Sequence, residues 1–185
     1  MRSEVSENLY WVERRDMAQP CVTKRLADVD SILTRAEQGL SFPLVQRVGI
    51  PQTVKLTDLR WQANAQSGRA SLFTGNEQRF FDNMYFTTDN FRKFSSLEEV
   101  AWIKLQTLLG KDHLAPDSVD RLREAWVEAR YYNQRLHYIA ERAEPWASAL
   151  HLKARNPGNF DATAYGLMSQ EMCQPIAGKH TPAPA

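Results

Sequence analysis

Hydrophobic side chains recur at alternating intervals of three and four residues along most of this chain, which is the spacing of one face of an α-helix. Two such rows come first: Val5, Leu9 and Val12, then Val22, Leu26, Val29 and Leu33. Pro20 separates the rows, and because proline lacks an amide hydrogen we expect the helix to kink or restart there. Gly39 can adopt the left-handed conformation that ends helices, so the second row should stop at this residue.

The segment that follows reads as a loop and then a short helix. Residues 40–56 are interrupted by two prolines and a glycine and show no helical period. We therefore expect an ordered loop, in which residues 54–56 could form a short strand. Thr57 or Asp58 can then cap a brief helix that runs through Gln66.

A capping box predicts the start of the next helix. The hydroxyl of Thr74 and the carboxylate of Glu77 have the spacing that satisfies each other's backbone amides. A phenylalanine-rich helix should run from there to residue 94, because Ser95 and the glutamates after it give a second capping signal. The second helix would end at Gly110. We therefore expect two helices that meet near Ser95.

The most regular pattern follows Pro116, a residue suited to the first position of a helix. One row alternates intervals of three and four without interruption: Val119, Leu122, Trp126, Ala129, Asn133, Leu136, Ala140 and Ala143. This row predicts a long bundle helix over residues 116–143, which Pro145 should end or bend. Beyond it, Asp161 can cap a last helix through Met172.

Together these elements predict an all-α fold, an irregular bundle of about six to eight helices with one long central helix at about 116–143. The length of 185 residues, with 43% hydrophobic and 24% charged residues, is typical of one folded domain. We expect that domain to span residues 1–175. Residues 176–185 carry too little apolar surface to order themselves, so they should form a disordered C-terminal tail.

The charge balance and the hydropathy limit the partners of this chain. Lys and Arg total 23 and Asp and Glu total 22, which argues against a nucleic-acid partner because such proteins carry an excess of positive charge. No stretch is long and apolar enough for a membrane span, and the first residues lack the apolar middle of a signal peptide. The chain opens inside an amphipathic pattern with no start signal before it. A truncated chain whose upstream membrane anchor is missing would show this pattern, whereas a true start at Met1 would make the protein cytoplasmic.

Residues that could catalyse a reaction or bind a metal show no recognisable arrangement. The four histidines have no helical pairing with one another, and neither a nucleophile elbow nor a glycine-rich phosphate loop occurs. His137 precedes Glu141 by four residues, and pairs of this kind are typical of helix surfaces. We therefore predict no catalytic residue, no metal and no cofactor, and an enzyme is unsupported rather than excluded.

Asn133 is the most informative polar residue, because it lies within the otherwise apolar row of the long helix. A buried amide must find hydrogen-bond partners, and core asparagines of this kind often set the register of packed helices. The alternative is that Asn133 anchors a small ligand in a pocket lined by Trp126, Tyr132 and Tyr131. The structural role has the better precedent in helical bundles.

Cys21 and Cys173 are the only cysteines of the chain. In a reducing cytosol they would remain two small buried hydrophobic side chains, whereas in an oxidising periplasm an isolated pair usually forms a disulfide. Such a bridge would fasten the last helix to the helix that follows Pro20. The residues alone leave both states open.

Several short motifs carry a resemblance to a known group. They are Pro20-Cys21-Val22 with Lys24-Arg25-Leu26, Leu59-Arg60-Trp61 with Ser67-Gly68, Glu98-Glu99-Val100-Ala101-Trp102, the stretch from Glu128-Ala129-Arg130 to Asn133, and Cys173. In this order, over most of the chain, they resemble a group of uncharacterised proteobacterial proteins that have an N-terminal membrane helix and a helical periplasmic domain. The resemblance implies a periplasmic domain anchored to the inner membrane, favours the disulfide between Cys21 and Cys173, and implies no activity. This chain lacks the membrane helix of that group, which we interpret as truncation.

Two hypotheses on function follow. The uninterrupted row of residues 116–143 and the lack of catalytic motifs favour a non-enzymatic periplasmic helical module that binds an unknown protein partner. The alternative is a sensor-like domain that binds a small ligand through Asn133, Trp126 and Tyr132. In either case the membrane would be reached only through an upstream anchor that this chain does not contain.

Overall fold

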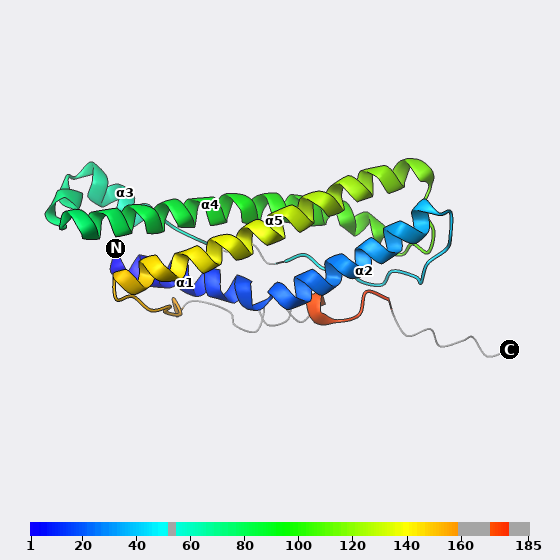
Figure 1. Cartoon of the computed structure of the whole chain (residues 1–185), viewed down its shortest axis with the longest axis horizontal. Coiled ribbons are helices and arrows are strands. Elements are labelled where there is room, and N and C mark those ends of the chain that lie inside the picture. The colour runs from blue at the N-terminus through cyan, green and yellow to red at the C-terminus, as the bar shows by residue number, and fades with distance from the viewer. Residues whose placement is uncertain (52–54, 159–170, 178–185) are drawn as a thin grey trace. The chain divides into compact units, whose positions relative to one another are not determined.

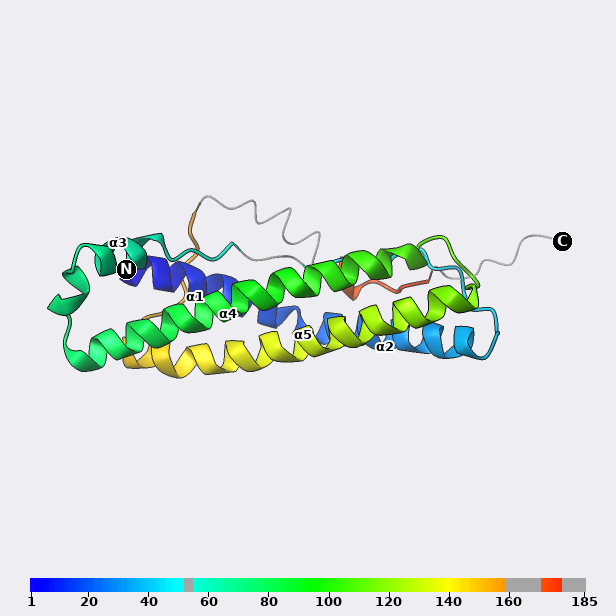
Figure 2. The ribbon, with the colours of Figure 1, turned by 90° about the horizontal axis from the view of Figure 1, so that it is seen from above.

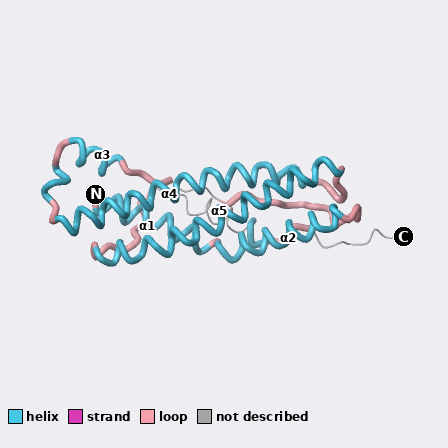
Figure 3. The backbone as a smooth tube through the Cα atoms, turned by 45° about the horizontal axis from the view of Figure 1, so that its top comes forward, coloured by secondary structure: helices cyan, strands magenta, loops and turns pink. Residues whose placement is uncertain are grey.

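A computed structural model describes residues 1–51, 55–158 and 171–177 of the chain (Figure 1). Its helices in chain order are α1 (Arg2–Met17), α2 (Gln19–Glu37), α3 (Leu59–Gln66), the 3-10 helix η1 (Arg69–Leu72), α4 (Gly75–Leu105), the 3-10 helix η2 (Gln106–Leu108) and α5 (Pro116–Ala149). The described residues contain helices and loops but no strand, as the tube in Figure 3 shows, and the one β-bridge joins Val45 to Ala177. The predicted all-α class with one long helix from Pro116 is confirmed.

Three of the predicted helix boundaries occur where the sequence places them. The first helix ends at Met17 and α2 restarts with Pro20 in its first turn. Gly39, with φ of 68°, ends α2 in a Schellman motif, in which the amides of Gly39 and Leu40 donate to the carbonyls of Ala36 and Arg35. At the start of α4, the amide of Glu77 donates to Thr74 Oγ1 at 3.3 Å, so the capping box is present.

The predicted break near Ser95 is wrong, because α4 continues from Gly75 to Leu105 as one helix. Neither proline nor glycine interrupts it after Gly75, and Ser95 is buried within its apolar side rather than placed at a helix end. The hydroxyl of Ser96 donates to the carbonyl of Arg92 one turn back. Serine side chains that bond to their own helix in this way do not need to act as caps.

Pro145 also fails to end a helix, since α5 continues through it to Ala149. Pro145 lies on the exposed side, while Ala143, Ala147 and Leu150 continue the buried row at intervals of four and three. Helix α5 ends instead at Ala149, where His151, with φ of 52°, supplies the left-handed residue of a Schellman motif. Packing of the buried row outweighs the hydrogen bond that the proline removes.

Contacts within the chain gather into two compact units, each described here by itself. Unit 1 comprises Met1–Met17, Thr53–Ser96 and Gln134–Asp161, and unit 2 comprises Ala18–Gln52, Leu97–Asn133 and Ala162–Ala185. Both units take part of α4 and part of α5. Because two continuous helices are shared in this way, the division does not test the prediction of a single domain over residues 1–175.

In unit 1, a row of buried polar side chains on α1 binds the segment before α3. The carboxylate of Glu4 accepts hydrogen bonds from the Tyr85 hydroxyl at 2.7 Å and from the Arg60 amide at 3.0 Å. One turn later, Asn8 exchanges two hydrogen bonds with the backbone of Thr57. Burial and the hydrogen bond to Glu4 raise the pKa of Tyr85, so this phenol stays neutral. These bonds satisfy the buried polar groups of Glu4 and Asn8.

Unit 2 has an apolar core built from five parts of the chain. Its buried members come from α2, the loop after α2, the C-terminal part of α4 and the N-terminal part of α5, together with Met172 and Ile176. The amide of Gln46 donates to the carbonyl of Ile176 at 3.0 Å, so ordered contacts extend past the predicted domain boundary at 175. The predicted helix from Asp161 falls mostly outside the described residues, as do Val54 of the proposed strand and residues 178–185 of the proposed tail.

Candidate functional site

The predicted ligand-binding residues lie on α5, and the structure gives two of them packing roles. Trp126 donates from its indole nitrogen to the carbonyl of Leu26 at 2.8 Å, which fastens α5 to α2. The guanidinium groups of Arg123 and Arg130 lie over its ring at 5.1 and 5.3 Å from the centroid. Asn133 is 2% exposed.

Tyr132, the third predicted residue, is half-buried and contacts the ring of its neighbour Tyr131 edge-on. These environments match those of core residues that hold helices together. The role of the three residues as a small-ligand site remains a prediction.

The predicted bridge between Cys21 and Cys173 is present, with a Cα–Cα distance of 4.7 Å. Both cysteines belong to unit 2, where the bridge joins the first turn of α2 to the helical turn at residues 171–173. It therefore ties together segments that are 152 residues apart in the sequence.

Arg25 lies one turn after Cys21 on α2 and holds the same segment from within. Its buried guanidinium donates to the carbonyls of Arg47 and Val48 in the loop after α2, and to the carbonyls of Glu171, Met172 and Gln174 near the C-terminus. Burial lowers the pKa of Arg25, partly offset by the charge of nearby Asp28. Because Cys21 and Arg25 are four residues apart, the sequence places them on the same side of one helix. Nothing in the sequence indicates that Arg25 binds five backbone carbonyls.

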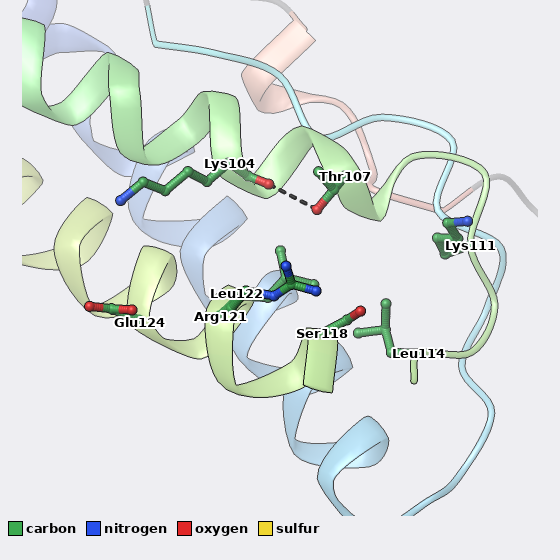
Figure 4. Close-up of a pocket in the computed structure, with 8 residues that line it drawn as sticks. All are labelled: Lys104, Thr107, Lys111, Leu114, Ser118, Arg121, Leu122 and Glu124. Carbon is green, nitrogen blue, oxygen red and sulfur yellow. Dashed lines mark hydrogen bonds between the residues drawn. The ribbon is translucent and has the colours of Figure 1, made fainter. Parts of the chain in front are cut away.

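A cleft in unit 2 is lined by residues from the end of α4, from the turn that follows η2 and from the first turns of α5 (Figure 4). Its volume is about 540 Å³, and its lining residues are Lys104, Thr107, Lys111, Leu114, Ser118, Arg121, Leu122 and Glu124. Figure 4 shows Lys111, Leu114 and Ser118 at one end of the opening and Lys104 and Glu124 at the other. Two leucines thus supply apolar lining and three cationic side chains surround it. Asn133, Trp126 and Tyr132 are not among the lining residues.

The three cations of this cleft differ in their partners. Lys104 donates to Glu128 of α5 at 2.7 Å, and this hydrogen bond raises the pKa of Lys104. Arg121 uses its Nε to bond the carbonyl of Asp117, and its charge has no carboxylate partner among the described residues. Lys111 is exposed and forms no ion pair with any residue that the structure describes. Lys111 and Arg121 are therefore two cationic groups of the cleft that have no ion pair with a described residue.

Next to the cleft, four exposed side chains form what we call the apolar face of unit 2. Val100 and Ile103 lie three residues apart on α4, and Val127 and Tyr131 lie four apart on α5. Each of the four is more than half exposed. The bond between Lys104 and Glu128 holds these stretches of the two helices side by side, as seen from above in Figure 2.

Sequence reasoning found neither the cleft nor the apolar face. The cationic residues of the cleft come from two helices and the turn between them, and no spacing along the chain brings them together before the fold is known. Val100 lies in the stretch after Ser95 for which the sequence predicts a separate helix. In the continuous helix, Glu98 and Trp102 are buried and Val100 faces solvent.

The histidine pair on α5 has a partner that the sequence could not show. His137 Nδ1 lies 2.7 Å from Asp16 of α1, and its Nε2 lies 3.7 Å from Glu141. The hydrogen bond to Asp16 raises the pKa of His137. Among the described residues, no three histidine, cysteine or acidic side chains are arranged to hold a metal ion. The pair therefore joins α1 to α5 within unit 1.

Comparisons of this protein with protein-family models, with curated proteins and with solved structures found no match. Within the part of the chain that the structure describes, no helix combines the length and hydrophobicity that a membrane crossing requires. Function is therefore inferred from the geometry of the sites.

Proposed function

We propose that this chain is a non-enzymatic helical module that binds another protein through the apolar face of unit 2. The observation that carries the proposal is the exposure of Val100, Ile103, Val127 and Tyr131 on two helices that an ion pair holds together. Single exposed apolar side chains are common on protein surfaces, whereas adjoining ones on packed helices are typical of interaction sites.

The neighbouring cleft indicates the chemistry of the partner. Val100 and Lys104 lie four residues apart on α4, and Thr107 follows three residues later in η2, so the apolar face continues directly into the cleft. The cleft presents Lys111 and Arg121 without acidic partners among the described residues. A partner segment with apolar residues beside acidic ones would cover the apolar face and pair with both cations. We therefore assign the face to an acidic amphipathic segment of a partner protein.

We further propose that the module works in the periplasm, anchored to the inner membrane by a segment upstream of Met1. The disulfide between Cys21 and Cys173 supports an oxidising compartment, because isolated cysteine pairs of this kind stay reduced in the cytosol. The resemblance to anchored periplasmic proteins supports the same location. Blocking free thiols in intact cells before lysis tests it: full protection of both cysteines is expected, and labelling of both would contradict the proposal.

Quantitative capture from intact cell envelopes tests partner binding. The disulfide-bonded protein is immobilised as wild type, as the pair Val100→Glu and Val127→Glu, as the pair Lys111→Glu and Arg121→Glu, and as Leu44→Glu. Leu44 is the matched control, since it is 51% exposed like Val100 but lies in the loop after α2. Circular dichroism checks that every variant is folded.

The proposal expects a protein that the wild type and the Leu44 variant retain to equal extents. The apolar pair of substitutions should reduce retention at least about tenfold, because charges would be placed inside the interface core. The cationic pair should reduce it as well, with a strong dependence on salt. Equal retention by all four proteins, or no specific retention by the wild type, would contradict the proposal.

A further inference from the structure

A second groove lies in unit 1, between the N-terminal part of α4 and the C-terminal part of α5. Each helix contributes five lining residues with the same spacing. Counted from Asn83 on α4 and from Arg135 on α5, they lie at positions i, i+3, i+4, i+7 and i+11. This spacing keeps each set on one side of its helix. The groove has a volume of about 370 Å³, which is in the range of small-molecule sites.

Two arginines of α5 are fixed in this groove by aromatic rings. The guanidinium of Arg135 lies over the rings of Phe94 and Tyr138, at 5.5 and 5.4 Å from their centroids. The guanidinium of Arg142 lies over Tyr138 at 5.6 Å and donates to its hydroxyl at 2.7 Å. Stacking of this kind holds a guanidinium in place while leaving donors free in its plane. Both cations are therefore oriented before a ligand arrives.

Neither arginine has an acidic partner among the described residues, and none of the groove's lining residues is acidic. The Nε of Arg135 is buried without a hydrogen-bond partner in the same set of residues. In unit 2, by contrast, a cation of α4 is neutralised by a carboxylate of α5, since Lys104 pairs with Glu128. Buried or oriented cations are normally neutralised, so two unneutralised ones in one groove indicate an anionic ligand.

The rest of the lining suits a ring with an apolar face beside that anion. Phe86 on α4 is 70% exposed and Tyr138 on α5 is 44% exposed, so both rings offer apolar faces to a ligand. Asn90 uses its amide nitrogen to bond the carbonyl of Phe86, which leaves its amide oxygen as an acceptor for a ligand hydroxyl. Aromatic faces with a few oriented polar groups are the usual composition of such sites.

From this arrangement we infer that the unit-1 groove binds a small carboxylate attached to a six-membered ring. The carboxylate pairs with Arg135 and Arg142, and the ring packs against the exposed faces of Phe86 and Tyr138. A sugar acid and an aromatic acid share this chemistry. The groove shares no residue with the apolar face of unit 2, so a test of ligand binding here does not depend on whether the protein partner binds.

Titration of the full chain, followed by NMR, tests the inference with matched probes. The two acids are glucuronate and benzoate, and their neutral counterparts are glucose and benzyl alcohol. The readouts are the Nε–H signals of Arg135 and Arg142 and the indole signal of Trp146, which also lines the groove. At least one acid should saturate these signals below about 10 mM and bind at least about tenfold more tightly than its neutral counterpart. Whichever acid binds identifies the source of the carboxylate.

Arg142→Gln should weaken binding of that acid at least about tenfold, because it removes one charge-assisted pair from an exposed position without disturbing the fold. Arg130→Gln is the matched control, since Arg130 also stacks on an aromatic ring of α5 but lies outside the groove. It should change the affinity less than about twofold. The inference is overturned if neither acid saturates, if a neutral counterpart binds as tightly, or if both arginine variants bind like the wild type.

Discussion

Arg25 makes five hydrogen bonds to backbone carbonyls and no ion pair with a described residue. It therefore acts as a structural clamp that fixes the loop after α2 and the segment at residues 171–174 to the same helix. Gly49 belongs to this clamp as well. A Cβ atom at Gly49 would lie 2.5 Å from the sulfur of Met172, and its φ of 75° also favours glycine.

Replacement of Arg25 by Met should lower the free energy of unfolding by about 3 kcal/mol or more, because buried carbonyls such as those of Val48 and Met172 would lose their donor. Urea unfolding with the disulfide intact measures this loss. Lys24→Met is the control, since Lys24 is exposed on the same helix and should matter by less than about 0.5 kcal/mol. Equal effects of the two substitutions would show that Arg25 is not a clamp.

His137 should make stability depend on pH in one direction. Folding raises its pKa above the ordinary 6.5, chiefly through the hydrogen bond to Asp16, so the folded state holds this proton more tightly. The stabilisation is complete below about pH 6.5 and disappears as the pH rises through the higher folded pKa. An NMR titration should show that Asp16→Asn lowers the pKa of His137 and that Glu141→Gln lowers it less. A larger effect of the Glu141 substitution would contradict the observed contacts.

At the scale of single elements, helix α4 shows what the sequence can and cannot predict. Its start was predictable, because the capping box at Thr74 and Glu77 acts through local bonds. The predicted break at Ser95 failed because serine followed by glutamate also fits a helix interior, where the buried side of the helix decides the outcome. Pro145 does not end α5 for a related reason, since the buried row continues on both sides of it.

The continuity of α4 predicts the effect of glycine at Ser96. Within a helix, Ser96→Gly should destabilise the protein by about 1 kcal/mol relative to Ser96→Ala, because glycine loses more backbone entropy. If Ser96 instead capped the start of a separate helix, glycine would cost only a few tenths of that amount relative to serine, and alanine would be the worse choice. Thermal unfolding of both variants distinguishes the two cases. Greater stability of the glycine variant would mean that α4 is broken.

At the scale of the whole molecule, the sequence predicted the helical class and the long helix from Pro116, whereas the residues left the state of Cys21 and Cys173 open and only the resemblance favoured the bridge. Helical periodicity and helix ends are local properties of the chain, so they can be read residue by residue. The cleft, the apolar face and the unit-1 groove could not be predicted in this way. Each is formed by residues on α4 and α5 that become neighbours only when the two helices pack, as Lys104 and Glu128 do.

The disulfide should contribute strongly to the stability of unit 2. Replacement of Cys21 and Cys173 by Ser removes a bridge that closes a loop of 152 residues, which the loop-entropy model values at up to about 5 kcal/mol. Urea unfolding of the double variant measures the loss, and mass spectrometry of the unreduced wild type should show the protein lighter by the two thiol hydrogens. A full-mass protein with two alkylatable thiols would show that the bridge does not form.

The central claim is that the apolar face of unit 2 contacts a protein partner, and site-specific photo-crosslinking in intact cell envelopes tests it most directly. A photoreactive residue placed at Val100 or Val127 should yield the same discrete crosslinked product, and Lys111→Glu with Arg121→Glu should abolish that product. The same photoreactive residue at Leu44, which is equally exposed, should yield none. Equal crosslinking from all three positions, or no product from Val100 and Val127, would contradict the account.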